Sequence, residues 1–251
     1  MKFLAIIQAR CGSRRLPNKI LKDIEGKPSL LRMLDRVSRS KLIEEIVVAT
    51  TINEEDVEVV KLVSTNGYKV FVGSCEDVLD RYYQAAKLFR PEYVIRLTAD
   101  CPLLDWRVID KAIEFVDDDI DDLAMISETF PDGEDVEIVK FSALERAWKE
   151  ARLSSEREHV TIYIKNHPEI FKIRDFINQN GNWREERWTL DEKEDLEVIR
   201  EIYKHFSPRT DFSMLEIYEY LKKTPSVRML NQKYIRNEGL LVSLENDRII
   251  K

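Results

Sequence analysis

The sequence predicts an α/β fold with a doubly wound, mostly parallel sheet covered by helices on both faces. Two observations support this prediction. Short β-branched, apolar runs alternate with segments of helical periodicity through the first half of the chain. These runs are apolar at nearly every position, which is typical of parallel strands buried on both faces. The 251 residues, 43% of them hydrophobic, suffice to bury such a core.

The individual elements follow from the same periodicities. Strands are expected at 2–7, 46–50, 69–73, 93–99 and 123–127, with an extended edge segment at 170–177. Helices are expected around 30–37 and at 54–64, 77–89, 106–116, 141–151, 157–167 and 191–206. The clearest of them, 191–206, places Leu196, Ile199 and Ile202 on one stripe. We expect one domain over 1–210, with a helical appendage of the same domain at 211–251 that covers the core or contacts another subunit.

Composition excludes several functional classes. A net charge of −7 and a pI near 5.3 argue against nucleic-acid binding, which needs an extended basic face. No apolar run approaches the roughly 20 residues that span a bilayer, and no signal peptide is recognised at the N-terminus. Three cysteines without a CxxC pair argue against a disulfide framework or a zinc site. We therefore expect a cytoplasmic protein with neither a membrane nor a nucleic acid as partner.

Positive charge concentrates on the loop that follows the first predicted strand. Residues 1–22 carry six Lys or Arg and no acid, and the stretch IIQARCGSRRLPNK (6–19) holds four of them. Ligands of doubly wound sheets bind at the carboxyl ends of the strands, which is where this loop begins. The glycine-rich phosphate motifs GxxxxGK[ST] and GxGxxG are absent. We expect Arg10, Arg14, Arg15 and Lys19, helped by donors of Gly12 and Ser13, to bind a nucleoside triphosphate. Pairing of these cations with surface acids is the alternative.

Two carboxylates are candidates for holding Mg²⁺, which uses one or two carboxylates together with substrate phosphates. Asp100 ends the fourth predicted strand, where it could instead cap a turn. Asp191 precedes the helix at 191–206 and, with Glu194 three residues on, forms a capping-box pattern. Capping through one oxygen and metal ligation through the other are compatible.

The motifs resemble those of the cytidylyltransferases that make CMP-sugars, the 3-deoxy-manno-octulosonate and acylneuraminate cytidylyltransferases. The branch named for the spore-coat polysaccharide biosynthesis protein F is the most similar. After IIQARCGSRRLPNK come GSCEDVLDRYYQAA, VIRLTADCPLLD, TFPDGEDVEIV, REHVTIYI and RWTLDEKEDLEVI, in the family's order. The resemblance implies a three-layer sandwich of the nucleotide-diphospho-sugar transferase type. It also implies the Mg²⁺-dependent reaction of CTP with a sugar to give a CMP-sugar and pyrophosphate, for surface polysaccharide or glycan biosynthesis.

By position, the resemblance assigns roles to residues of this chain. Arg10 and Lys19 match the triphosphate-binding residues and, with Asp100, the catalytic set, while Arg14 or Arg15 assists. Asp100 and Asp191 match the metal-binding aspartates. Gln8 and Ala9 match the loop backbone near the nucleotide, and Asp80 and Arg81 lie in the segment near the base. As neighbours on a helix, Asp80 and Arg81 cannot both point inward.

The acceptor side is less constrained by the sequence. We expect Asp135, Glu137, Arg157 and His159 to contact the sugar, although a solvated strand face and helix packing are alternatives. A keto-sugar acid is the acceptor that the family favours. Asp132, however, replaces a usual basic residue and makes this side more acidic, so a neutral sugar remains open.

The expected chemistry is in-line attack of a sugar hydroxyl on the α-phosphate of CTP, driven by positioning and charge stabilisation. A nucleotide-sugar-dependent glycosyltransferase is one alternative, but TADCP supplies only one Asp where a DxD motif is usual. A non-catalytic nucleotide-binding protein of the same fold is another. A homodimer is a family expectation, and the preference for cytosine rests on the resemblance alone.

Overall fold

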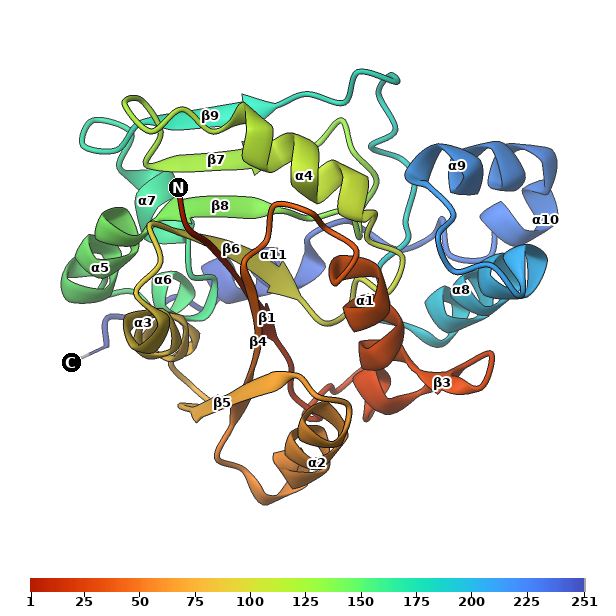
Figure 1. Cartoon of the computed structure of the whole chain (residues 1–251), viewed down its shortest axis with the longest axis horizontal. Coiled ribbons are helices and arrows are strands. Elements are labelled where there is room, and N and C mark those ends of the chain that lie inside the picture. Colours follow the sequence, from red (N-terminus) through yellow and green to blue (C-terminus); the bar gives the residue numbers. More distant parts are fainter. Residues whose placement is uncertain (251) are drawn as a thin grey trace.

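A seven-stranded sheet forms the centre of the molecule in the computed structural model, which describes residues 1–250. The spatial order is β5-β4-β1-β6-β8-β7-β9, and only β8 runs antiparallel to its neighbours (Figure 1). The strands are β1 (Phe3–Gln8), β4 (Glu45–Thr51), β5 (Lys69–Gly73), β6 (Tyr93–Thr98), β7 (Leu123–Ile126), β8 (Glu137–Lys140) and β9 (Ile173–Phe176). A separate two-stranded hairpin pairs β2 (Asp23–Ile24) with β3 (Lys27–Pro28).

Helices connect the parallel strands and continue after the sheet is complete. They are α1 (Ser29–Val37), α2 (Val57–Thr65), α3 (Val78–Phe89), α4 (Trp106–Phe115), α5 (Phe141–Glu150), α6 (Ser154–Glu158), α7 (Ile162–Asn166), α8 (Lys193–Phe206), α9 (Met214–Lys223), α10 (Pro225–Arg228) and α11 (Glu238–Glu245). Single 3₁₀ turns lie at Lys19–Leu21 and Glu54–Asp56. Within residues 1–250, no helix has the length and apolar character needed to cross a membrane.

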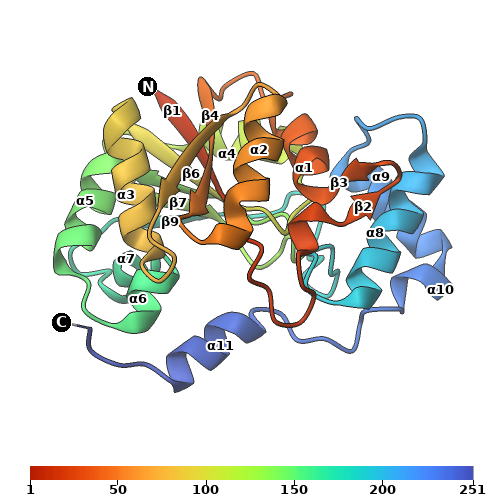
Figure 2. The same cartoon turned by 90° about the horizontal axis from the view of Figure 1, so that it is seen from below.

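The apolar strands divide their side chains between two core layers. Along β1, Phe3, Ala5 and Ile7 pack with α1, α2, α4, α8 and α9, while Leu4 and Ile6 pack with α3, α5 and α7. Figure 2 shows the sheet between these two groups of helices. The predicted α/β fold with a mostly parallel sheet covered on both faces is therefore confirmed.

The single helix expected at 157–167 was wrong, because the segment is broken. Helix α6 ends at Glu158 and α7 begins at Ile162, and Val160 between them has the left-handed φ of 41°. A β-branched residue with positive φ is strained. The break turns Thr161 and Lys165 towards the buried carboxylate of Glu137, at 2.9 and 2.5 Å.

The segment at 211–251, as far as residue 250, is anchored to the rest of the chain at both ends. Phe212, Met214, Ile217 and Leu221 are buried in the main core. Helix α11 has no buried residue and crosses the lower side of Figure 2, apart from the sheet. We call residues 229–250 the C-terminal arm. The Asp247 carboxylate fastens its end by accepting hydrogen bonds from the hydroxyls of Ser154 and Ser155, at 2.9 and 2.7 Å.

A buried arginine ties α1 to the connection between α8 and α9. Arg36 is 1% exposed, and its guanidinium donates to the carbonyl oxygens of Leu103, Leu104, Thr210 and Phe212 at 2.9–3.0 Å. Its planar group also stacks over the ring of Phe212, 4.4 Å from the centroid. The guanidinium thus satisfies four carbonyl groups from two loops at once.

Replacing this side chain tests that role. We expect Arg36→Met to lower the free energy of unfolding by about 3 kcal/mol, because buried carbonyl groups lose their donors. Arg36→Lys should recover only part of this loss, since an ammonium lacks the planar fork. Urea denaturation monitored by circular dichroism measures both, and an unfolding midpoint unchanged in Arg36→Met would contradict the assignment.

Candidate functional site

A large cleft lies at the carboxyl ends of β1 and β6, where the strand order reverses. Strand β1 pairs with β4 on one side and with β6 on the other, so the loops after Gln8 and Thr98 diverge there. The cleft has a volume of about 1140 Å³. We call it the first cleft. It brings together these residues singled out from the sequence: Gln8, Ala9, Arg10, Gly12, Ser13, Arg14, Arg15, Lys19, Asp100 and Asp191.

Lys19 joins the two acidic residues that the sequence singled out. Its ammonium lies 2.7 Å from a carboxylate oxygen of Asp100 and 2.7 Å from one of Asp191. These three residues come from the end of the first loop, the end of β6 and the start of α8. Both carboxylates therefore face one point in the first cleft, although 91 positions (100 to 191) separate them in the chain.

Within this cluster, Lys19 and Asp100 shift each other's pKa values in the direction that favours the ionised forms. Burial by itself would raise the pKa of Asp100, but the Lys19 ammonium outweighs it and lowers the pKa to about 2. Burial would lower the pKa of Lys19, yet the Asp100 and Asp191 carboxylates raise it above its ordinary value. At neutral pH Lys19 and Asp100 are thus both charged.

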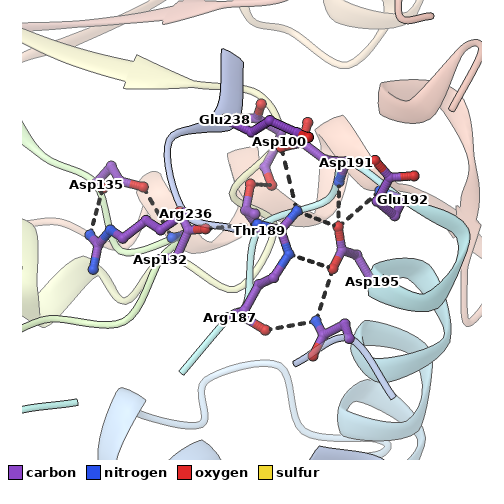
Figure 3. Close-up of polar contacts among 12 residues, drawn as sticks. Asp100, Asp132, Asp135, Arg187, Thr189, Asp191, Glu192, Asp195, Arg236 and Glu238 are labelled. Atoms are coloured by element: carbon purple, nitrogen blue, oxygen red, sulfur yellow. Dashed lines mark hydrogen bonds and ion pairs between the residues drawn. The ribbon is translucent and has the colours of Figure 1, made fainter. Parts of the chain in front are cut away.

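A second carboxylate at the start of α8 leaves Asp191 free to face the cleft. The capping box expected from Asp191 and Glu194 was wrong, since the carboxylate of Asp195 caps the helix instead. It accepts the backbone N–H groups of Asp191 and Glu192, at 2.9 and 2.8 Å (Figure 3). Arg187 holds Asp195 in place with two bonds of 2.9 Å. The side chain of Asp191 is consequently available to Lys19 and to a ligand.

The remaining cations of the first loop differ in their partners. Arg15 pairs with Asp191 at 3.0 Å, with Glu192 at 3.3 Å and with Glu238 of the C-terminal arm. Arg10 and Arg14 are exposed, and neither forms an ion pair with an acid among residues 1–250. The alternative of surface pairing thus holds for Arg15, while Arg10 and Arg14 remain open to an anion.

A second cleft of about 550 Å³ adjoins the first and shares Gln8, Arg15, Thr98, Asp100 and Asp191 with it. Its further lining includes Asp135, Glu137 and His159, as expected for the acceptor side, and also Asp132. Glu137 binds the guanidinium of Arg96 at 2.6 Å and the ammonium of Lys165 at 2.5 Å. Burial, together with the neighbouring Asp135, raises the pKa of Asp132 to about 7.

The structure places three of the expected residues, Asp80, Arg81 and Arg157, outside both clefts. The guanidinium of Arg157 donates to Asp77 at 2.9 Å and to the carbonyl of Trp148 at 2.7 Å, so it joins α6 to α3. Asp80 accepts hydrogen bonds from the Trp148 indole and from Gln84. Of the adjacent pair, Arg81 is the inward residue: it is 1% exposed and lines a small cavity together with Gln8, Ala9 and Arg10.

Several cleft residues escaped the sequence prediction: Arg96, Lys165, Arg187, Thr189, Arg236 and Glu238. The sequence could have indicated Arg96, because a charged residue in the middle of an apolar strand needs a buried partner. No local sequence pattern indicates Arg236 or Glu238. Only the path of the C-terminal arm brings them to the cleft, where Arg236 lies 3.4 Å from Asp135 (Figure 3).

The donor set of the first cleft fits a hard divalent cation. Two carboxylates converge on a point that already attracts a positive group, the Lys19 ammonium. No group of three or more His, Cys, Asp or Glu residues within 1–250 is placed to hold a metal by itself. Mg²⁺ is commonly bound by one or two carboxylates and completed by substrate phosphates, which is the arrangement available here.

Comparison with known proteins decides the family. A sequence model described as cytidylyltransferase matches residues 4–238. The chain belongs to the cytidylyltransferase family. Spore coat polysaccharide biosynthesis protein SpsF of Bacillus subtilis is 34% identical, over 89% of this chain and 95% of that protein.

Solved structures agree with this family assignment. The structure of a cytidylyltransferase from Leptospira borgpetersenii is 34% identical and superimposes with a TM-score of 0.88, over 94% of this chain and 99% of that chain. The CMP:2-keto-3-deoxy-manno-octonic acid synthetase complexed with CTP has a TM-score of 0.63 over 82% of this chain and 99% of that chain. At 19% identity, the latter supports the fold alone.

The ion pairs of Glu137 predict a pH-dependent effect on stability. Burial would raise the pKa of Glu137, but Lys165 and Arg96 outweigh it and lower the pKa below the ordinary 4.5. Its ionised form therefore stabilises the fold above pH 4.5, and this contribution is lost as the pH falls further.

We expect Glu137→Gln to lower the free energy of unfolding at pH 7 by about 3 kcal/mol, because two cations lose their buried partner. The gap between wild type and variant should narrow as the pH falls from 4.5 towards 3. Urea titrations at several pH values measure it, with the exposed Glu169→Gln as control. A gap that stays constant or widens towards pH 3 would contradict the assignment.

Proposed function

We propose that this cytidylyltransferase transfers CMP from CTP to a sugar hydroxyl, releasing pyrophosphate, in a Mg²⁺-dependent reaction of surface polysaccharide or glycan biosynthesis. The observation that carries the proposal is the convergence of Lys19, Asp100 and Asp191 on one point of the first cleft. A polyanionic substrate and its cation need both signs of charge in one place, and this cluster supplies them.

The first cleft suits a triphosphate. Arg10 and Arg14 present guanidinium groups that no acid within 1–250 neutralises, and such groups bind phosphate oxygens with two parallel hydrogen bonds. Gly12 and Ser13 add a backbone N–H and a hydroxyl to the same wall. These donors also stabilise the charge that develops on pyrophosphate as it leaves, so no covalent intermediate on the protein is required.

The junction of the two clefts suits the transfer itself. Asp100, Asp191 and Gln8 border both clefts, so a nucleotide in the first and an acceptor in the second meet beside them. Holding the two reactants in line removes much of the entropic barrier of a bimolecular step. Bound to Asp100 and Asp191, Mg²⁺ would neutralise phosphate charge and make the attacking hydroxyl more acidic.

Pyrophosphate release tests the reaction class. We expect the protein to form pyrophosphate from CTP, Mg²⁺ and a suitable sugar, and to lose this activity on removal of divalent ions with EDTA. Each of the four nucleoside triphosphates is incubated with a panel of sugars, and the products are identified by mass spectrometry. Formation of a nucleoside diphosphate instead of pyrophosphate, or full activity in EDTA, would contradict the proposal.

Asp100→Asn tests the role of this carboxylate. We expect at least about a hundredfold loss of kcat, because the amide keeps the shape but carries no charge. Thermal unfolding should stay close to wild type, since Lys19 keeps Asp191 as a partner. Asp119→Asn, an exposed change of the same kind, is the control. A variant Asp100→Asn with wild-type Mg²⁺-dependent turnover would disprove the assignment.

A further inference from the structure

The point where Asp100 and Asp191 converge already holds a positive charge from the protein. The Lys19 ammonium lies 2.7 Å from Oδ2 of Asp100 and 2.7 Å from Oδ1 of Asp191. The Lys19 side chain is only 14% exposed, so the ammonium lies between the carboxylates and largely away from solvent. Because Mg²⁺ binds carboxylate oxygens at about 2.1 Å, a divalent ion bound to both of these oxygens would need the same space.

The two other oxygens of these carboxylates have donors as well. Oδ2 of Asp191 lies 3.0 Å from a guanidinium nitrogen of Arg15 and 3.6 Å from one of Arg187. Oδ1 of Asp100 accepts a weak hydrogen bond from the thiol of Cys101, at 3.7 Å. All four oxygens that could ligate a cation are therefore engaged within the protein, and a divalent ion has to displace at least one of these groups.

Moving the ammonium away from both carboxylates is unfavourable unless it gains another anion. Separating a largely buried ion pair leaves charges that are neither paired nor well hydrated. The nearby acids Glu192 and Glu238 already pair with Arg15. Arg10 and Arg14 line the same cleft without acidic partners among residues 1–250, so they add positive charge to the surroundings. A triphosphate supplies the missing anion, since an ammonium binds phosphate oxygens as it binds carboxylates. A bare divalent ion supplies none.

We propose that Lys19 excludes divalent cations from Asp100 and Asp191 until a nucleoside triphosphate is bound. In the free protein the ammonium neutralises the two carboxylates. When the triphosphate binds, the ammonium transfers to its phosphate oxygens, and both carboxylates become free to bind the Mg²⁺ that accompanies the nucleotide. This inference rests on the function proposed above and adds to it the order in which the ligands bind.

Metal binding to the nucleotide-free protein tests this exclusion. The probe is Mn²⁺, whose unbound form is quantified by electron paramagnetic resonance. We expect Lys19→Met to bind one Mn²⁺ at least about tenfold more tightly than wild type, because the competing ammonium is gone and both carboxylates keep their charge. Combining Lys19→Met with Asp100→Asn should abolish the gain, and the exposed Lys41→Met, the control for a lost charge, should bind Mn²⁺ as wild type does. Equal Mn²⁺ affinity in Lys19→Met and wild type would overturn the proposal.

Thermal unfolding gives a second readout that needs neither nucleotide nor turnover. In EDTA, we expect Lys19→Met to unfold at a lower temperature than wild type, since Asp100 loses its cationic partner and still faces Asp191. Mn²⁺ should raise the unfolding temperature of this variant by several degrees and leave that of wild type unchanged, because a ligand stabilises the state that binds it. The same rise in both proteins, or in neither, would contradict the exclusion by Lys19.

Wild type by itself tests the role of the triphosphate, whether or not the variants fold. We expect CTP in EDTA to raise the unfolding temperature, and Mn²⁺ without CTP to leave it unchanged. A rise with Mn²⁺ alone would overturn the inference and leave the proposed transfer reaction standing. An unfolding temperature that CTP raises neither in EDTA nor with Mn²⁺ would contradict the proposed function, on which the inference rests.

Discussion

The candidate site depends on one shared ammonium. Lys19 lies 2.7 Å from both Asp100 and Asp191, and each of the three residues is placed by a different part of the fold. Lys19 lies in the loop after strand β1, Asp100 lies two residues after the end of its neighbour β6, and Asp191 lies at the capped start of α8. Two carboxylates that face one point repel each other, and the attraction of both to a cation between them offsets this repulsion. The ammonium therefore allows these carboxylates to be held ready before any substrate arrives.

Ion pairs within the protein determine which charged groups of the two clefts remain free to bind a ligand. Where the protein neutralises its own cations, as Glu137 does for Arg96 and Lys165, little net positive charge is left for a ligand. Where it leaves guanidinium groups open, as at Arg10 and Arg14, the wall attracts anions. Charge selectivity in such a cleft follows from which residues are already paired, more than from how many of each sign line it.

The sequence predicted what local periodicity and short motifs determine. Buried strands, the basic loop after β1 and Asp100 at the end of β6 all follow from patterns within a few residues. The break at Val160 could not be predicted, because the attraction of Thr161 and Lys165 to Glu137 overrides helical periodicity from more than 20 residues away. The cap of α8 was misplaced for a similar reason: both Glu194 and Asp195 suit the pattern, and Arg187 together with Asn231 favours Asp195. Long-range pairing decides such cases.

The hydrogen bonds from Ser154 and Ser155 to Asp247 attach the end of the C-terminal arm to the start of α6. This attachment has a consequence for the order in which the cleft is completed. Within this sequence the loop bearing Lys19 is synthesised before the C-terminal arm, since it lies about 200 residues earlier in the chain. All strands of the sheet precede that arm in the chain, since β9 ends at Phe176. The cleft wall formed by Arg236 and Glu238 arrives only afterwards. The wall of the cleft is therefore completed last, and a fragment cut before residue 229 would contain every strand of the sheet while lacking part of that wall.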